Sequence, residues 1–154
     1  MAPRNETPED LQNEREVAAV LADAWNCDLK KLTEDRLYLA DYAVVEDGDI
    51  KAFVEIRCRS CSSTTYPTLY IPLHKVLWAQ SVFASTKTPY LYVVRFDGDG
   101  VIAYRLIAGG GPYMAGMVWA ERRTERDTHP DGPVLEIMSD SFKVLARENH
   151  ELDI

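Results

Sequence analysis

The chain has 154 residues, of which 46% are hydrophobic and 27% charged, and its formal net charge is −8. This size and composition predict one soluble globular domain with a real core, and the acidic total argues against a protein that simply coats nucleic acid. The sequence has no apolar run of membrane length and no recognisable signal peptide, so we expect a cytoplasmic protein without a membrane partner.

Charge and cysteine are unevenly distributed along the chain. Residues 1–50 carry 5 Lys/Arg and 13 Asp/Glu, whereas residues 51–95 carry 6 Lys/Arg and a single acid, Glu55. A basic segment in an acidic body is compatible with a local phosphate site and equally with uneven surface charge. Three cysteines are too few for a disulfide framework, and the lone Cys58-x-x-Cys61 pair fits a buried Cys58 better than a zinc site.

A helix is predicted at the start of the chain. Thr7 is a plausible N-cap with Pro8 at the first helical position, and the apolar stripe continues to about Trp25. Glu14 is the one acid in that stripe, and the stripe by itself favours a solvated residue at its edge. Residues 26–36 are interpreted as a polar connection.

A β-hairpin is predicted next, from two apolar runs at 37–45 and 50–59. The intervening Glu46-Asp47-Gly48-Asp49 contains Asp-Gly, a strong turn signal. Strand side chains alternate, so one face of the second run is apolar and the other carries an acid flanked by cations. The apolar face comprises Ala52, Val54, Ile56 and Cys58, and the other face comprises Lys51, Phe53, Glu55, Arg57 and Arg59.

The remaining segments complete an α/β pattern. We predict a loop at 60–70, a helix from about 71 to 85, and strands at 90–96 and 101–107. Short strands at 114–120 and 134–138, a charged loop at 121–133 and a final helix carrying Phe142 and Leu145 are expected beyond. The result is a mixed central sheet of about four or five strands with helices on both sides. It forms a single domain over residues 1–154, with a core at about 8–107 and a C-terminal extension at 108–154.

The order of these elements carries a family resemblance. A helix with Glu, a strand with Asp, a hairpin, the segment FVEIRCR, a helix and the strand YLYVVRF occur in that order over residues 10–107. This resembles the PD-(D/E)XK nucleases, a restriction-endonuclease-like superfamily, and most of all its small RecB-like, Holliday-junction-resolvase-like and phage-encoded members. The resemblance implies the nuclease fold, DNA as partner, and Mg²⁺ or Mn²⁺ as cofactor.

The resemblance also implies which residues hold the metal. Asp41 and Glu55 match the motif acids, the carbonyl of Ile56 is the expected third ligand, and Glu14 matches the helix glutamate, with Glu16 as the alternative. The chemistry is consistent with this set, because Mg²⁺ favours carboxylates and phosphodiester hydrolysis uses a metal to generate hydroxide and offset charge.

One position departs from the family pattern. The motif ends in Lys in the family, and Arg57 stands there in this chain. Arginine holds phosphate well but is a poor proton donor or acceptor. Arg57 is therefore expected to orient the phosphate, and Lys75 or Lys51 is expected to take the role of the motif lysine. Arg57, Arg59, Lys75 and Gln80 are the expected DNA-binding residues.

Two functions follow from these observations. The first is a metal-dependent DNA nuclease, endonucleolytic and structure-selective, in which Glu14, Asp41, Glu55 and Arg57 are catalytic. The alternative is a catalytically inactive nuclease fold that serves in DNA binding or assembly, which Arg57 and the acidic total favour. A homodimer remains open. Among other aromatic residues, Tyr66, Tyr70 and Trp78 could stack on bases, although packing is the commoner use.

The hairpin register decides whether Asp41 and Glu55 can act together. A regular two-residue Asp47-Gly48 turn would place Asp41 opposite Val54, on the wrong face to join Glu55. A three-residue loop or a bulge adds one residue and brings Asp41 opposite Glu55. We therefore predict the longer loop or a bulge, with the carboxylates within about 5 Å of each other so that one cation can bridge them.

Overall fold

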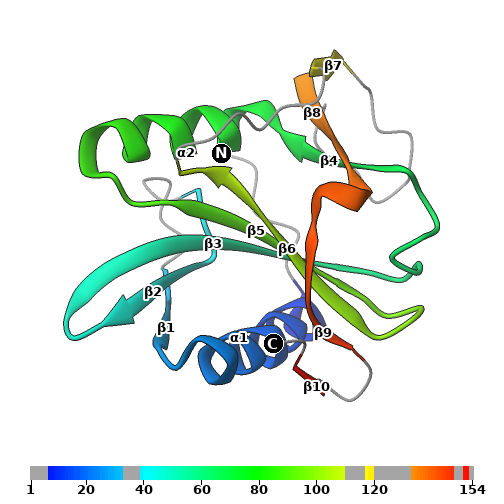
Figure 1. Cartoon of the computed structure of the whole chain (residues 1–154), viewed down its shortest axis with the longest axis horizontal. Helices are drawn as coiled ribbons and strands as arrows, with labels where there is room; N and C mark the ends of the chain where they lie inside the picture. Colours follow the sequence, from blue (N-terminus) through cyan, green and yellow to red (C-terminus); the bar gives the residue numbers. More distant parts are fainter. Residues whose placement is uncertain (1–6, 33–38, 110–116, 120–132, 148–150, 153–154) are drawn as a thin grey trace.

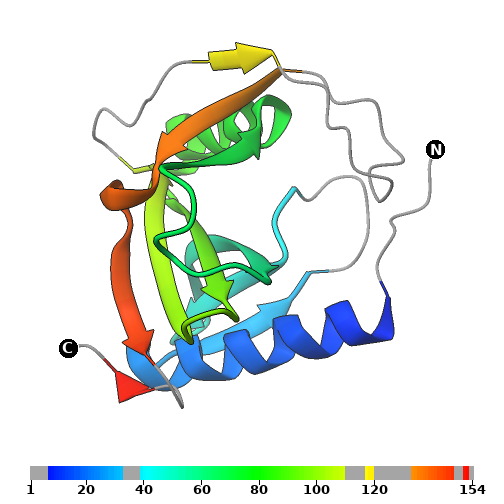
Figure 2. The ribbon, with the colours of Figure 1, turned by 90° about the vertical axis from the view of Figure 1, so that its right-hand side faces the viewer.

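The structure is a computed structural model that describes residues 7–32, 39–109, 117–119, 133–147 and 151–152. Its two α-helices lie on opposite faces of one large sheet (Figures 1 and 2). They are α1 (Pro8–Trp25) and α2 (Leu73–Thr86). The strands of the large sheet within the described residues are β1 (Asp28–Lys31), β2 (Tyr42–Glu46), β3 (Asp49–Arg59), β5 (Tyr90–Phe96), β6 (Val101–Ala108), β9 (Lys143–Arg147) and β10 (Glu151–Leu152).

The large sheet is mixed. Its described strands follow the order β1-β2-β3-β5-β6-β9-β10, and only the central β3–β5 pair among them is parallel. This parallel pair needs a crossover, which the segment containing α2 provides. The predicted α/β class with helices on both sides of a mixed sheet is confirmed.

A second, smaller sheet lies on the α2 side. It contains β4 (Thr68–Pro72), β7 (Met117–Trp119) and β8 (Pro133–Met138), in the order β4-β8-β7. The 3₁₀ turn η1 (Ser139–Ser141) then carries the chain from β8 into β9 of the large sheet. β4 leads directly into α2, so the small sheet fixes where that helix begins.

Both faces of the large sheet are packed. On one face, α1 contributes Val17 and Leu21 to a cluster with Val54 and Ile56 of β3. On the other face, α2 and the small sheet pack over Tyr90, Tyr92 and Val94 of β5, among others. Thr7 caps α1 through a reciprocal capping box with Asp10.

Four secondary-structure predictions are corrected. The predicted connection at 26–36 contains β1, a mostly exposed edge strand whose polar sequence lacks alternation. The predicted loop at 60–70 ends earlier than expected, because β4 begins at Thr68. The segment expected as a final helix forms η1 and β9, since pairing with β6 overrides local propensity. These strands bring the described large sheet to seven rather than four or five. The predicted charged loop at 121–133 lies almost wholly outside the described residues.

No helix in the described part of the chain is both long enough and apolar enough to cross a membrane.

Candidate active site

The β2–β3 hairpin combines a short turn with a bulge. Asp47 and Gly48 both have positive φ, 52° and 81°, and Glu46 pairs with Asp49 across this two-residue turn. The register then shifts, because Val45 pairs with Ile50 but Val44 pairs with Ala52, which leaves Lys51 as the extra residue. The predicted bulge is thus confirmed, and the three-residue loop is not used.

The bulge brings Asp41 to the level of Glu55. Tyr42 pairs with Val54 beyond the shift, so Asp41, the residue before β2, comes next to Glu55 in the same register. Its backbone N–H donates to the Val54 carbonyl at 2.9 Å. Without the extra residue, the carboxylate of Asp41 would point to the α1 face of the sheet.

Asp41 is a buried acid with a specific hydrogen bond. Only 3% of its surface is exposed, and the Ile56 N–H donates to its Oδ2 at 2.8 Å. Burial and the neighbouring Glu55 charge raise the pKa of Asp41, while the hydrogen bond from Ile56 opposes that rise. Ile56 therefore reaches the site through its N–H, and a metal-binding role for its carbonyl stays a prediction.

Glu55 is held between two cations. Its residue is 2% exposed, its Oε2 accepts a hydrogen bond from the Lys75 ammonium, and Arg57 Nη2 lies 3.1 Å from the same oxygen. Burial lowers the pKa of Lys75, although the Glu55 charge partly offsets this effect. Glu55 raises the pKa of Arg57. Lys75 is thus a buried lysine in direct contact with a motif acid.

Lys75 reaches Glu55 from helix α2, whereas the motif lysine would stand on strand β3, at the position of Arg57. It lies in the first turn of α2, immediately after β4, and its side chain is 12% exposed. Lys51, the other stand-in suggested by the sequence, is instead the exposed bulge residue near the hairpin turn. The structure therefore separates the two candidates, with Lys75 at the acid pair and Lys51 away from it.

Glu14 lies apart from this group. It is on α1, 8% exposed, and it accepts a hydrogen bond from Lys31 Nζ at 2.9 Å. Across the described residues, no three His, Cys, Asp or Glu side chains lie together as a metal cluster would require. Helix α1 packs on the opposite face of the sheet from Glu55, and the metal-binding role of Glu14 stays a prediction. Glu16, the alternative helix acid, pairs with Arg95 at 3.6 Å.

The other predicted DNA contacts lie on the α2 side of the sheet. Arg57 and Arg59 share the β3 face of Glu55, and the side chain of Arg57 is 43% exposed. Gln80 is exposed on α2. Trp78 packs edge-to-face against the rings of Phe53 and Tyr90, so it belongs to the core.

Sequence reasoning missed one positioning residue, Tyr90. Its hydroxyl donates to the Leu39 carbonyl at 2.5 Å, which fixes the chain two residues before Asp41. Burial and the charges of Glu55 and Asp41 raise its pKa. The sequence signal that could have identified Tyr90 is the alternation of tyrosines in YLYVVRF, because Tyr90 and Tyr92 share the sheet face of Glu55.

Comparisons with known proteins show the family and the fold of this chain. Residues 1–143 match the family described as "Phage putative PDDEXK endonuclease". The fold is similar to that of Archaeoglobus fulgidus Hjc, a Holliday junction resolvase from an archaeal hyperthermophile, with a TM-score of 0.54 and 11% identity over 85% of this chain and 89% of that one. Curated protein sequences give no match. Because the family match spans nearly the whole chain and includes the Asp41–Glu55 pair, this protein belongs to the phage PD-(D/E)XK endonuclease family, a family of nucleases.

Proposed function

We propose that this chain is a metal-dependent endodeoxyribonuclease of the cytoplasm that selects its DNA by structure. The observation that carries the proposal is the buried Asp41–Glu55 pair with Lys75 bonded to Glu55. A pair of buried acids held beside two cations is a costly arrangement for stability alone. Such groups are typical of catalytic sites.

The donor set fits Mg²⁺ or Mn²⁺. Two carboxylates on neighbouring strands are hard oxygen ligands, and such a cation ordinarily keeps several of its waters. Bound there, the metal would supply a water of lowered pKa and would offset charge on the phosphate. Asp41 and Glu55 would hold it, with the Ile56 carbonyl as a further ligand.

The two cations then have separate roles. Lys75, whose pKa is lowered by burial, would exchange a proton with the attacking water or the leaving oxygen if Glu55 held the metal. Arg57 is always charged and offers a planar pair of donors, so it would orient the scissile phosphate. In this proposal Lys75 replaces the motif lysine in function, and Arg57 occupies its position.

The inactive nuclease fold remains as a second candidate, for a specific reason. Glu14 is paired with Lys31 rather than gathered with the two motif acids. A site with only two acids and an arginine in the motif could bind DNA and metal without cleaving. DNA binding would then survive while hydrolysis is absent.

A cleavage assay separates these candidates. Supercoiled plasmid, linear duplex and a four-way junction would be incubated with the protein in Mg²⁺, Mn²⁺ or EDTA, and the junction comes first because Hjc is a Holliday junction resolvase. We expect metal-dependent cuts, most in the branched DNA, that are lost in Glu55→Gln. DNA binding without cleavage in either metal would favour the inactive fold. Size-exclusion chromatography with light scattering would test the proposed homodimer.

A further inference from the structure

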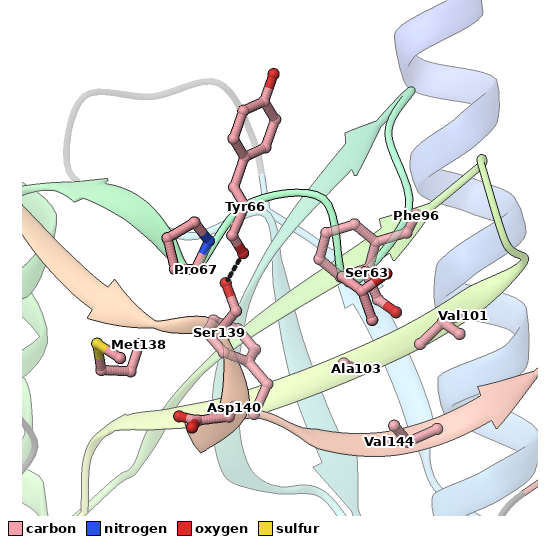
Figure 3. Close-up of a pocket in the computed structure, with 12 residues that line it drawn as sticks. Ser63, Tyr66, Pro67, Phe96, Val101, Ala103, Met138, Ser139, Asp140 and Val144 are labelled. Atoms are coloured by element: carbon pink, nitrogen blue, oxygen red, sulfur yellow. Dashed lines mark hydrogen bonds between the residues drawn. The ribbon is translucent and has the colours of Figure 1, made fainter.

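A pocket lies on the same side of the large sheet as the acid pair. Its volume is about 360 Å³, near the lower end of the range for small-ligand sites, roughly 300–1,000 Å³. Its floor is apolar and includes Phe96 and Ala103, and its rim is formed by the β3–β4 loop and η1 (Figure 3). Phe142 also lines the pocket. We propose that this pocket binds an unpaired base of the DNA strand that the protein cuts, a proposal that rests on the proposed function.

Strand register and one ring contact connect the pocket to the acid pair. Glu55 is level with Tyr92 on the neighbouring strand, and the Tyr92 ring packs edge-to-face on Phe142, with centroids 5.9 Å apart. Arg59 is likewise level with Phe96, a floor residue. Arg59 follows Glu55 by four positions, about 13 Å along a strand. One DNA strand can therefore reach both the acid pair and the pocket.

Arg59 supplies a positive charge at the pocket end of this path. Its Nε is buried and has no hydrogen-bond partner in the part of the chain that the structure describes. Nε itself is closed to solvent, so a phosphate would be held by the terminal nitrogens of this half-buried side chain. A strand that passes from Arg57 to Arg59 would thus keep its phosphates on the arginines and turn a base toward the pocket.

The lining of the pocket suits a base rather than a phosphate. A base has flat apolar faces that stack on aromatic rings and a polar edge. Asp140 at the rim is negative, which disfavours a phosphate inside the pocket itself. The apolar floor with a polar rim therefore matches a base, and the nearby arginines match its backbone.

The polar groups of the rim are mainly acceptors. Ser63 Oγ donates its hydrogen to Asp99 Oδ2 at 2.6 Å, and Ser139 Oγ donates to the Tyr66 carbonyl at 2.8 Å (Figure 3 shows the second bond). Both hydroxyls keep lone pairs for a ligand but have used their hydrogens. Together with the Asp140 carboxylate, they favour a base with an exocyclic amino group, such as adenine or cytosine, over thymine.

The rim is held firmly in place. The Gly98 N–H donates to the Cys61 carbonyl at 3.1 Å, and the Ser63 N–H donates to Asp99 Oδ2 at 3.1 Å. At the other end of the loop, the Ser139 N–H donates to the Pro67 carbonyl at 2.8 Å. The pocket is thus formed before any ligand arrives, which lowers the ordering cost of binding.

The test uses DNA binding without cleavage, in EDTA. A blunt duplex is compared with the same duplex carrying a single-stranded arm of adenines or thymines, with 2-aminopurine in the arm as a fluorescent reporter of stacking. We expect tighter binding of the adenine arm and quenching of the reporter. Ala103→Leu should fill the pocket, remove the quenching and cost about 5- to 150-fold in arm affinity, the range for one lost base stack.

Two further variants make the result decisive. Tyr66→Ala alters an exposed rim residue and should also weaken arm binding, whereas Leu77→Ala, at an exposed position of α2 outside the pocket, should change nothing. Thermal melting checks that each variant folds. Arm binding that is unchanged in both Ala103→Leu and Tyr66→Ala, or that is equal for adenine and thymine, would overturn the proposal. Metal-dependent cleavage is scored separately, so quenching without cleavage rejects the nuclease proposal alone.

Discussion

Glu55 and Asp41 differ in how their charges are balanced, although both are buried. Glu55 touches two cations, Lys75 and Arg57, whereas the pKa of Asp41 is raised by burial and by the charge of Glu55. The folded protein therefore binds a proton at Asp41 more readily than the unfolded chain does. The ionised form of Asp41 opposes folding, so this contribution to stability falls as the pH rises through and above the ordinary range of an aspartate.

Asp41→Asn and Glu55→Gln should consequently have opposite effects on the metal-free protein. Asp41→Asn keeps an acceptor for the Ile56 N–H and removes the charge, so it should raise the Tm at neutral pH. The rise should be about 2–4 °C for each kcal/mol gained in the free energy of unfolding. This gain should shrink in acid. Glu55→Gln leaves Lys75 without its partner and should cost about 3–5 kcal/mol. Melting curves from acidic to neutral pH would measure both, and a lower Tm for Asp41→Asn would contradict this reading of the site.

Lys75 and Lys51 give a matched pair of variants. If Lys75 exchanges a proton in the reaction, Lys75→Ala should lower the cleavage rate about 10²- to 10⁴-fold, and Lys75→Arg should not restore it, because arginine stays charged. Lys51→Ala should leave the rate within about twofold of the wild type, since Lys51 is exposed at the bulge. Single-turnover cleavage of a labelled junction measures this. Full activity of Lys75→Ala would assign the proton transfer elsewhere.

Cys58 is predicted to be unreactive. Burial raises the pKa of its thiol to about 11, and the thiolate is the nucleophile. Alkylation of Cys58 by iodoacetamide should therefore be slow at neutral pH and rise about tenfold per pH unit until the pH approaches 11. Peptide mass spectrometry after timed labelling follows this residue separately from Cys61. Rapid labelling at neutral pH would indicate that Cys58 is more accessible than its half-buried position in the structure implies.

Among the larger elements, the β3–β4 loop rests on the β5–β6 turn at Gly98. A Cβ added to Gly98 would lie 2.7 Å from the backbone of Cys61 and of Ser62. Neither backbone atom can move without displacing the loop. The close approach of the two segments thus requires glycine at this position.

Gly98→Ala should accordingly destabilise the protein by about 1–3 kcal/mol through crowding. It should also speed hydrogen exchange at Ser62 and Ser63. Gly48→Ala is a suitable control, because its added Cβ meets nothing within 4 Å and its cost comes only from a left-handed backbone. The control should leave exchange in the β3–β4 loop unchanged. Denaturant unfolding with exchange mass spectrometry tests both, and an unaltered loop in Gly98→Ala would refute the packing argument.

On the scale of the whole molecule, a net charge of −8 limits how DNA can be held. The candidate contacts are Arg57, Arg59 and Lys75, on one side of the sheet, and most of the remaining surface should repel phosphate. Binding should involve about three phosphates. The slope of log K against log salt should therefore be about −3 for duplex DNA without divalent metal.

Fluorescence anisotropy over a range of salt concentrations measures that slope. Arg59→Ala should reduce it by about one unit if Arg59 holds a phosphate. Lys87, which lies beyond α2 with its ammonium 5.5 Å from the Phe83 ring centre, offers a control in Lys87→Ala. A wild-type slope of about −6 or steeper would mean that DNA contacts a much larger surface than these three residues.

The sequence by itself determined the local features of this protein. Alternation separated the face of β3 that packs on α1 from the face of Glu55. Thr7 and Pro8 marked the start of α1, and Asp47-Gly48 marked the turn. Each depends on residues a few positions apart, so a short window of sequence contains the cause. The order of those elements was also enough to indicate the nuclease family.

Only the tertiary structure decided how these features meet. Lys75 reaches Glu55 because β4 pairs with β8, more than 60 residues away, and thereby sets the start of α2. Glu14, which matches the family acid in the sequence, forms an ion pair with Lys31, and its helix packs on the other face of the sheet from Glu55. Strand β9 replaced an expected helix because β6 supplied its partner. Such contacts join distant parts of the chain, and their energy belongs to the assembled sheet rather than to any local pattern.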